Sequence, residues 1–379
     1  MRLASVAGVL DVAVIRRTGP AGWSMDRLAD ALEGSRVDEG LRIRGIGPRT
    51  AQGTGQAHEW SARWHRWVCQ PLELTRVAGD VFHLVDHSDA HLLRVLPAER
   101  TVVTCHDLLL LRAEAGELPY AGRRWWGARF RWTVGHLRRA GAVVCPSEAT
   151  RSDVLRFCDV EPERTHVIPQ GIASYFRPST SDARMATRRR LKLGDAQVVF
   201  QVATGVFYKN VQVGPAVIAS LHERGLDVVM VRVGPPLSLT DRAQAESAGL
   251  AGRIIELGAV SEPELVELYG AADALLFPST GEGFGWPALE AMACGLPVIV
   301  SSTPALTELT GGAARRAAPD DVVGLADEVA TVLTDDDVAA TMRAAGLRRA
   351  GTYTWERTLR SYASIYCSLA EDSPPDCTR

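Results

Sequence analysis

GEGFGWPALEAMACGLPVIVS, residues 281–301, follows the apolar run ADALLFPS at residues 272–279. The apolar run predicts a buried strand, the glycines predict a loop, and the next residues predict a helix with Pro287 in its first turn. Gly295 ends that helix, and PVIVS predicts a second strand. Strands joined by helices form parallel sheets, whose ligands bind at the carboxyl ends of the strands. The stretch therefore predicts an α/β fold with a ligand site at the glycine loop.

The same alternation of short apolar runs and helical segments continues along the chain, which has 379 residues and is long enough for two domains. We expect a first domain over 1–176, a second over 190–353, and a terminal helix at about 354–370. Residues 174–195 are rich in charges and turn formers and lack a sustained apolar period. The predicted strands are 3–15, 81–85, 101–105, 142–145, 166–168, 198–202, 228–233, 254–257, 274–277 and 298–301.

The composition excludes several classes of protein. A formal net charge of -3 and a pI near 6.3 give no reason to expect nucleic acid as a partner. Seven cysteines without a CxxC pair indicate reduced thiols. No run approaches the ~20 apolar residues of a membrane span, and Asp11 interrupts the first apolar run, which predicts a strand rather than a signal peptide. These features predict a soluble, cytoplasmic protein.

The glycine loop combines features that suit an anion with features that do not. Gly283 and Gly285 permit close approach of the backbone, and the start of a helix attracts a group such as a diphosphate. Glu282 and Glu290 would repel that anion, so carboxylates here suit neighbouring hydroxyl groups. A diphosphate flanked by two polyols, as in a nucleotide sugar, fits this combination. The alternative is a generic α/β turn with surface acids.

The segment resembles the E-x(7)-E signature of retaining GT-B glycosyltransferases, specifically glycosyltransferase family 4, and weaker resemblance covers nearly the whole chain. The resemblance implies two Rossmann-like domains with parallel sheets that face each other across a cleft. It also implies that Glu282 contacts the donor sugar and Glu290 the ribose. Gly283, Phe284 and Gly285 would then supply backbone hydrogen-bond donors.

Lys209 is a second candidate in this half of the chain. It lies in TGVFYKN, residues 204–210, and is expected to open a helix at the carboxyl end of a strand. Only one other lysine, Lys192, occurs in a chain that otherwise uses arginine. The resemblance implies that Lys209 binds the diphosphate, whereas the family's frequent second arginine is absent between residues 204 and 209. A solvated lysine at a helix start is the alternative.

The first half of the chain carries candidates for the reacting centre and the acceptor. The pair His106 and Asp107 follows a predicted strand, and the resemblance implies that His106 lies near the donor sugar. A core or capping histidine is the alternative. Asp86 and His87 end another strand, where acceptor positioning competes with helix capping by Asp86 or Ser88.

Two further segments remain open. Gly22 and Trp23 follow the first strand, where the resemblance implies contacts with the acceptor. Residues 122–139, GRRWWGARFRWTVGHLRR, mix arginine with tryptophan and suit either a membrane surface or inward packing of the tryptophans. We favour inward packing.

These observations predict a glycosyltransferase that moves a hexose from a nucleotide-diphosphate donor to an acceptor hydroxyl. Retention at the anomeric carbon follows from the resemblance alone. No cofactor or metal is expected, because Lys209 and backbone N–H groups can stabilise the leaving diphosphate. A sugar-nucleotide epimerase of the same fold and a non-enzymatic nucleotide-sugar-binding protein are the alternatives.

Overall fold

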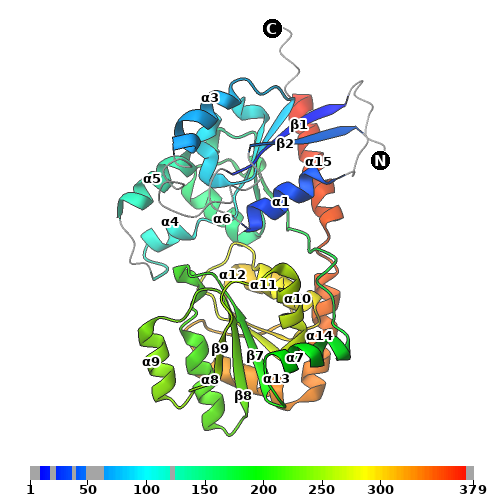
Figure 1. Cartoon of the computed structure of the whole chain (residues 1–379). Coiled ribbons are helices and arrows are strands. Elements are labelled where there is room, and N and C mark those ends of the chain that lie inside the picture. Colours follow the sequence, from blue (N-terminus) through cyan, green and yellow to red (C-terminus); the bar gives the residue numbers. More distant parts are fainter. Residues whose placement is uncertain (1–8, 18–22, 36–39, 48–63, 120–123, 373–379) are drawn as a thin grey trace. The chain divides into compact units, whose positions relative to one another are not determined.

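The computed structural model describes residues 9–17, 23–35, 40–47, 64–119 and 124–372, and Figure 1 shows their helices and strands. The chain forms two compact units. Unit 1 comprises residues 1–114, 121–171 and 355–379, and unit 2 comprises residues 115–120 and 172–354. Each unit is built around its own sheet and its own apolar clusters.

Unit 1 contains a parallel sheet with the strand order β2-β1-β3-β4-β5-β6. The strands are β1 (Leu10–Ile15), β2 (Leu41–Ile46), β3 (Val81–Leu84), β4 (Thr101–Thr104), β5 (Ala142–Cys145) and β6 (Thr165–Val167). The helices and helical turns are α1 (Trp23–Glu33), η1 (His65–Cys69), α3 (Gln70–Leu74), η2 (His87–Arg94), η3 (Ala98–Arg100), α4 (Leu109–Glu114), α5 (Arg124–Val134), η4 (Gly135–Arg139), α6 (Glu148–Phe157), η5 (Pro162–Arg164) and α15 (Trp355–Asp372).

Unit 2 contains a second parallel sheet, with the strand order β12-β11-β10-β7-β8-β9. The strands are β7 (Gln197–Val202), β8 (Val228–Val233), β9 (Ile254–Glu256), β10 (Ala274–Phe277), β11 (Val298–Ser301) and β12 (Arg315–Ala317). The helices and helical turns are α7 (Ser181–Arg190), η6 (Phe207–Lys209), α8 (Val213–Glu223), α9 (Leu239–Ser247), α10 (Glu262–Ala271), α11 (Trp286–Ala293), α12 (Pro304–Thr310), α13 (Val322–Thr334) and α14 (Asp336–Ala350).

The two parallel sheets confirm the predicted α/β fold class. Ten of the twelve strands of the described residues were predicted from their apolar runs; the start of β1 is seven residues later than predicted, and the other ends differ by less. The two missed strands, β2 and β12, read LRIRGI and RRA and are edge strands. Their arginines interrupt the apolar run that marks a buried strand. Arg44 of β2, for example, forms an ion pair with Asp11 at 3.0 Å.

Residues 177–189 lie between the two predicted domains and mostly form α7, which belongs to unit 2. Ion pairs, rather than a stripe of apolar side chains, fix this helix to the rest of the unit. Arg184 and Arg188 both bind Asp273, at 2.6 and 3.3 Å, and Arg190 binds Glu267 at 2.8 Å. A helix fixed by ion pairs shows no apolar stripe in its sequence, which explains why the stretch resembles a linker.

The last helix, α15, packs on the sheet of unit 1 through Tyr362 and Tyr366, which are fully buried. Both hydroxyls enter a buried network: Tyr366 contacts His83 Nδ1 at 2.7 Å, and Tyr362 contacts Thr104 Oγ1 at 2.9 Å. Thr104 also contacts His83 Nε2 at 2.8 Å. Burial lowers the pKa of His83 to about 3, so this histidine is neutral.

The main segment of unit 2 begins and ends at neighbouring points. The backbone N–H of Ile172 donates to the carbonyl oxygen of Tyr353 at 2.9 Å, and Ile172 pairs with Thr354 in a β-bridge. The first and last residues of this segment therefore lie next to each other.

Two further features concern the described residues as a whole. None of their helices is both long enough and apolar enough to cross a membrane. Six of the seven cysteines lie in this part of the chain, and none of these six forms a disulfide.

Acid is expected to destabilise unit 1 more than unit 2. His83, His91, His106 and His166 all lie in unit 1, and burial lowers the pKa of each. An unfolded histidine titrates at about 6.5, so below that pH the unfolded state binds more protons than the folded state, and stability falls as the pH drops from 7 to 5. Burial raises the pKa of Asp89 to about 6, which opposes part of this loss.

Hydrogen exchange followed by mass spectrometry at both pH values, corrected for the intrinsic exchange rate, checks this expectation. Protection of β3 and β4 should decrease more than protection of β7 and β10. Equal losses in both units would contradict it.

Candidate functional site

The strand order of unit 2 reverses at one place, and sheets of this kind bind their ligands in a crevice at such a point. The chain runs from β7 to β8 and β9 on one side of the sheet, then returns to β10, which pairs with the other edge of β7. Helices that follow β7 and β10 therefore diverge to opposite faces, and ligands of such sheets bind at the carboxyl ends of these two strands. The loops that follow them carry Lys209 and Glu282.

Asn210 ties these two loops together. Its side-chain amide donates to the carbonyl oxygens of Pro278 at 3.0 Å and of Pro319 at 2.7 Å. The backbone N–H of Thr280 also donates to the carbonyl oxygen of Tyr208 at 2.8 Å. The sequence analysis did not select Asn210, although an asparagine directly after a strand-end turn is the residue type that tolerates a left-handed backbone.

The prediction that Lys209 opens a helix is wrong. Lys209 ends the short turn η6, and α8 begins only at Val213. Asn210 between them has a φ of 51°, in the left-handed region, which interrupts the right-handed turn. The interruption places Lys209 in the loop rather than on the helix.

Lys209 and Glu282, two of the predicted site residues, form an ion pair across the crevice. The Lys209 Nζ donates to both carboxylate oxygens of Glu282, at 2.7 and 3.0 Å. The side chains are only 12% and 6% exposed, so water screens the pair weakly. The ammonium also lies 5.1 Å from the ring centre of Phe277 and 5.4 Å from that of Tyr208.

The glycine loop leads into α11 as predicted, with Pro287 in the first turn. Gly285 is the N-cap and has a φ of 105°, and a Cβ there would lie 2.5 Å from Leu306 Cδ2, so both backbone conformation and space require glycine. Phe284 is 7% exposed and packs edge-on against Trp286. The start of α11, where helical N–H groups have no partner within the helix, therefore lies beside Glu282 and Lys209 in the crevice.

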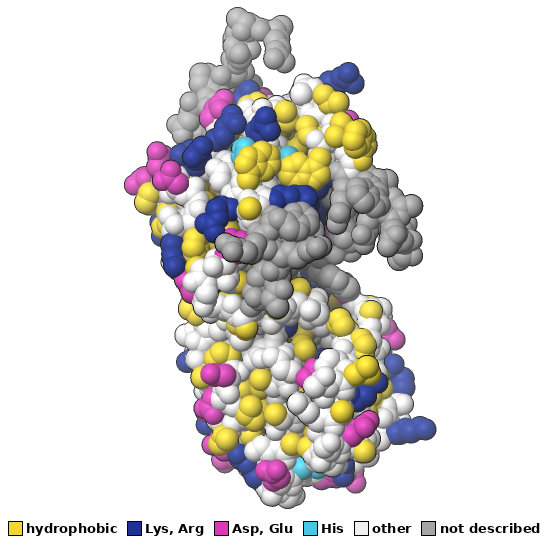
Figure 2. All heavy atoms as spheres, turned by 90° about the vertical axis from the view of Figure 1, so that its left-hand side faces the viewer, with side chains coloured by type: hydrophobic (Ala, Val, Ile, Leu, Met, Phe, Trp, Pro, Cys, Tyr) yellow, Lys and Arg dark blue, Asp and Glu magenta, His cyan; other side chains and the backbone are white. Residues whose placement is uncertain are grey.

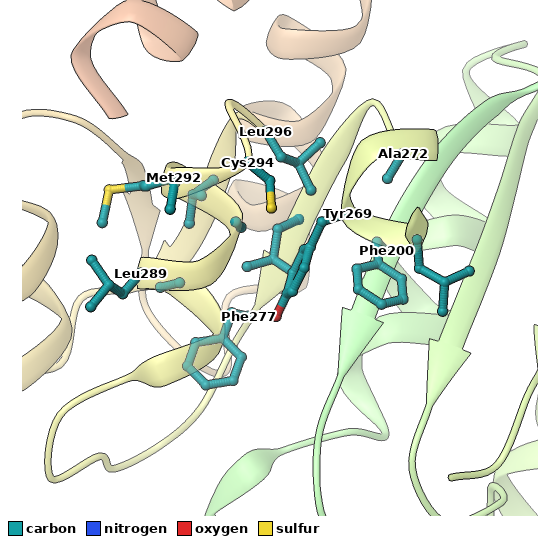
Figure 3. Packing of buried hydrophobic residues seen from close by; sticks show 14 of the residues in the cluster. Phe200, Tyr269, Ala272, Phe277, Leu289, Met292, Cys294 and Leu296 are labelled. Carbon is teal, nitrogen blue, oxygen red and sulfur yellow. The ribbon is translucent and has the colours of Figure 1, made fainter. Parts of the chain in front are cut away.

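Glu290 lies on the inner side of α11 and is 3% exposed. One of its oxygens accepts a hydrogen bond from the hydroxyl of Tyr269 at 2.8 Å. Figure 3 shows the Tyr269 ring between Phe200 and the helix that carries Leu289, and the Phe200 ring centre is 5.2 Å away. Tyr269 was not among the predicted site residues. A buried tyrosine hydroxyl requires a partner, which was the available signal.

In unit 1, both ring nitrogens of His106 are engaged. The Nε2–H donates to the carbonyl oxygen of Val85 at 2.8 Å, and the amide of Gln170 lies 3.3 Å from Nδ1. The backbone N–H of His106 donates to His87 Nδ1 at 3.3 Å. Burial lowers the pKa of His106, so the ring is neutral and its Nδ1 acts as an acceptor. Gln170 was not predicted, and nothing in the nearby sequence distinguishes it.

The acidic candidates of unit 1 cap helical turns. Asp86 accepts from the backbone N–H of Ser88 at 2.8 Å, and Asp107 accepts from that of Leu109 at 3.2 Å. Asp86 is fully buried, and its second oxygen lies 3.3 Å from Arg17 Nε. Burial alone would raise the pKa of Asp86, but the adjacent His87, Arg17 and Arg66 together hold it well below its usual range.

Two candidates cannot be placed by their side chains. Gly22 lies outside the described residues, and Trp23 begins α1 with a side chain that also lies outside them. Among the described residues, no cluster of His, Cys, Asp and Glu could hold a metal ion.

Taken together, the described residues of unit 2 near the ends of β7 and β10 include a lysine paired with a carboxylate, a second buried carboxylate and a helix start. This set can bind a ligand that has both an anionic part and hydroxyl groups.

Comparisons with known proteins agree with this chemistry. The family profile described as "Glycosyl transferases group 1" matches residues 184–349, and the profile described as "Glycosyltransferase Family 4" matches residues 27–174. The first profile covers the crevice of unit 2, and the second covers most of unit 1.

Individual relatives match at moderate identity. A serotype-specific mannosyltransferase of Escherichia coli is 25% identical over 325 residues, which cover 81% of this chain and 39% of that protein. The O-antigen chain mannosyltransferase B of Escherichia coli is 38% identical over 239 residues, which cover 61% of each chain. The chain thus spans between about two fifths and three fifths of the length of these relatives.

Solved structures share the fold. Anabaena HepE, crystallised with UDP and glucose, superposes with a TM-score of 0.75 at 17% identity, over 95% of this chain and all of that one. The solved structures that share the fold are GT-B glycosyltransferases, which have a two-domain α/β architecture. On both profiles and on this fold, the chain belongs to the group 1 and family 4 glycosyltransferases.

Proposed function

We propose that this protein transfers a hexose from a nucleoside-diphosphate donor to an acceptor hydroxyl, without a metal ion and with retention of the anomeric configuration. The observation that carries the proposal is the ion pair of Lys209 and Glu282 in the crevice of unit 2, beside the start of α11. A diphosphate needs the cation and the helix start, and a sugar needs the carboxylate. In this proposal the lysine and the carboxylate lie where the diphosphate and the sugar of the donor are joined.

Each residue then has one task. Lys209 and the N–H groups at residues 283–285 bind the diphosphate and stabilise the charge that develops as it leaves. Glu282 accepts hydrogen bonds from the hydroxyl groups of the transferred sugar, and Glu290, oriented by Tyr269, accepts them from the ribose. Two relatives are mannosyltransferases by name, so a mannosyl donor is the first hexose to test.

Unit 1 supplies the acceptor side in this proposal. His106 takes part as a neutral ring, because burial lowers its pKa, and its Nε2–H is held by the carbonyl oxygen of Val85. Its Nδ1 is the nitrogen that can accept a hydrogen bond from a sugar hydroxyl, in exchange for the amide of Gln170. Asp86, His87 and Asp107 position the loops that end β3 and β4.

One assay separates this proposal from an epimerase or a binding protein. Thermal shift with UDP-, GDP- and dTDP-sugars first identifies the donor, because a ligand of the folded state raises the melting temperature. Incubation with that donor should release nucleoside diphosphate slowly, and faster when an acceptor is present. Epimerised donor without released diphosphate would refute transfer, and so would binding without any turnover.

Replacing Lys209 with alanine is expected to lower turnover at least ~10-fold, because the leaving diphosphate loses its charged partner. The matched control is Lys192→Asn, which removes the only other lysine of the sequence. Lys192 is exposed with a φ of 55°, which asparagine tolerates. Steady-state rates of donor consumption measure both variants. Wild-type turnover in Lys209→Ala would remove this residue from the mechanism.

The variant Glu282→Gln should separate recognition of phosphate from recognition of sugar. In the structure Glu282 accepts a hydrogen bond from Lys209, so a diphosphate that binds Lys209 has to replace a hydrogen bond between charged groups, worth roughly 1.5 kcal/mol. We therefore expect free nucleoside diphosphate to bind about tenfold more tightly to the variant, while turnover of the complete donor falls. Calorimetric titration with the diphosphate alone, beside the rate assay, tests this. Weaker binding of the diphosphate would contradict the competition.

The variant Glu290→Ala is expected to weaken donor binding, because the ribose loses its acceptor. The variant Tyr269→Phe keeps the carboxylate and removes only the hydroxyl that orients it, so its KM for the donor should rise less, by ~3- to 10-fold for one hydrogen bond. Both variants lose a buried partner and should also melt earlier. The KM ratio between them therefore reports on the ribose contact, and equal KM values would contradict it.

A further inference from the structure

A group of aromatic side chains lies exposed on unit 1. Trp64 is 65% exposed and Trp132 is 47% exposed. Trp67, half-buried, lies 6.1 Å from Trp132 between ring centres. The Arg129 guanidinium lies 4.5 Å above the ring of Trp67, and His136 meets Trp132 edge-on at 4.7 Å. We call these five residues the tryptophan surface.

Helical geometry holds the tryptophan surface together. Trp67 stacks on His91 of η2 at 4.1 Å, which anchors η1 to the body of unit 1. Trp132 and His136 are four residues apart across the junction of α5 and η4, so they project from one face. Leu72 of α3, which continues directly from η1, is also 65% exposed. Figure 2 views the side of unit 1 where α3 and α5 lie, and hydrophobic, histidine and arginine side chains are intermixed there.

The expectation that the tryptophans of this basic segment pack inward is wrong for Trp132. The core positions of α5 are taken by Thr133 and Val134, which leaves the neighbouring Trp132 outside. The exposed indoles of Trp64 and Trp132 are unfavourable in water alone, because each exposes apolar area that burial would stabilise. A partner that takes up their rings removes this cost.

The charge around the tryptophan surface identifies that partner. Residues 64–76 and 128–139 contain a single acid, Glu73, in a protein whose formal net charge is -3. The same segments contain six arginines: Arg66, Arg76, Arg129, Arg131, Arg138 and Arg139. Asp89 binds Arg66 and Glu114 binds Arg131. Arg138 and Arg139 are exposed in η4, the helical turn that also carries His136.

We propose that the tryptophan surface binds the face of a membrane that contains anionic phospholipids. Indole rings favour the boundary between headgroups and acyl chains, where the ring is buried and its N–H stays near polar groups. Guanidinium groups pair with lipid phosphates and are attracted by the negative surface potential. A membrane is favoured over a protein because the exposed apolar groups and the unbalanced positive charge lie side by side, which matches the layering of a lipid interface.

The test is sedimentation of the purified full chain with vesicles of phosphatidylcholine alone or of an equal mixture with phosphatidylglycerol. We expect binding to the anionic vesicles that weakens with added salt. The double variant Trp64→Ser/Trp132→Ser should lower the partition coefficient at least ~10-fold. The variant Arg138→Ser/Arg139→Ser should lower it by ~25-fold, about fivefold per arginine, on anionic vesicles only.

Matched controls come from unit 2. Leu239 is 84% exposed and Arg189 is exposed on α7, so Leu239→Ser and Arg189→Ser remove similar groups elsewhere and should bind vesicles like the wild type. Circular dichroism establishes that each variant is folded. Equal binding of the wild type and the tryptophan variant would overturn the proposal. So would a change of oligomeric state in that variant without loss of vesicle binding, which would assign the surface to a contact between copies of the chain.

Discussion

The ion pair of Lys209 and Glu282 exists because β7 and β10 are neighbours, although the two residues are 73 positions apart in the sequence. Parallel strands place all their carboxyl ends at one edge of the sheet, and the reversal of strand order between β7 and β10 brings two loops together there. The glycine loop, the left-handed Asn210 and the start of α11 are all arranged around this meeting point. In a nucleotide sugar the diphosphate is anionic, whereas the sugar carries hydroxyl groups. The pair contains an ammonium that suits the first and a carboxylate that suits the second.

Much of unit 2 was predictable because its signals are local. Apolar runs predicted every central strand, and Pro287 and Gly295 predicted the limits of α11. The missed elements depend on partners far along the chain. The charged helix α7 is held by acids from around residues 267–273, and Asn210 is held by carbonyl oxygens more than sixty positions away. No pattern within a single segment encodes such contacts.

In the first half of the chain, the candidate residues could be predicted but their contacts could not. The sequence pointed to the residues that follow β3 and β4, but not to the hydrogen bonds that they form. His106 is neutral because burial lowers its pKa. Its ring nitrogens contact Val85 and Gln170, and Gln170 comes from a different strand end. Asp86 caps a helical turn while it faces two arginines, so its structural and electrostatic roles cannot be separated by sequence spacing.

The adjacency of Ile172 and Tyr353 gives the chain a modular character. Because the main segment of unit 2 starts and stops at hydrogen-bonded neighbours, it has the connectivity of a domain inserted into another, and the helix α15 of unit 1 is synthesised after it. During translation unit 2 can therefore finish its core while unit 1 still lacks a layer that covers its sheet. The same junction offers natural cut points for recombination, through which another domain of this kind could replace unit 2 without breaking a strand order.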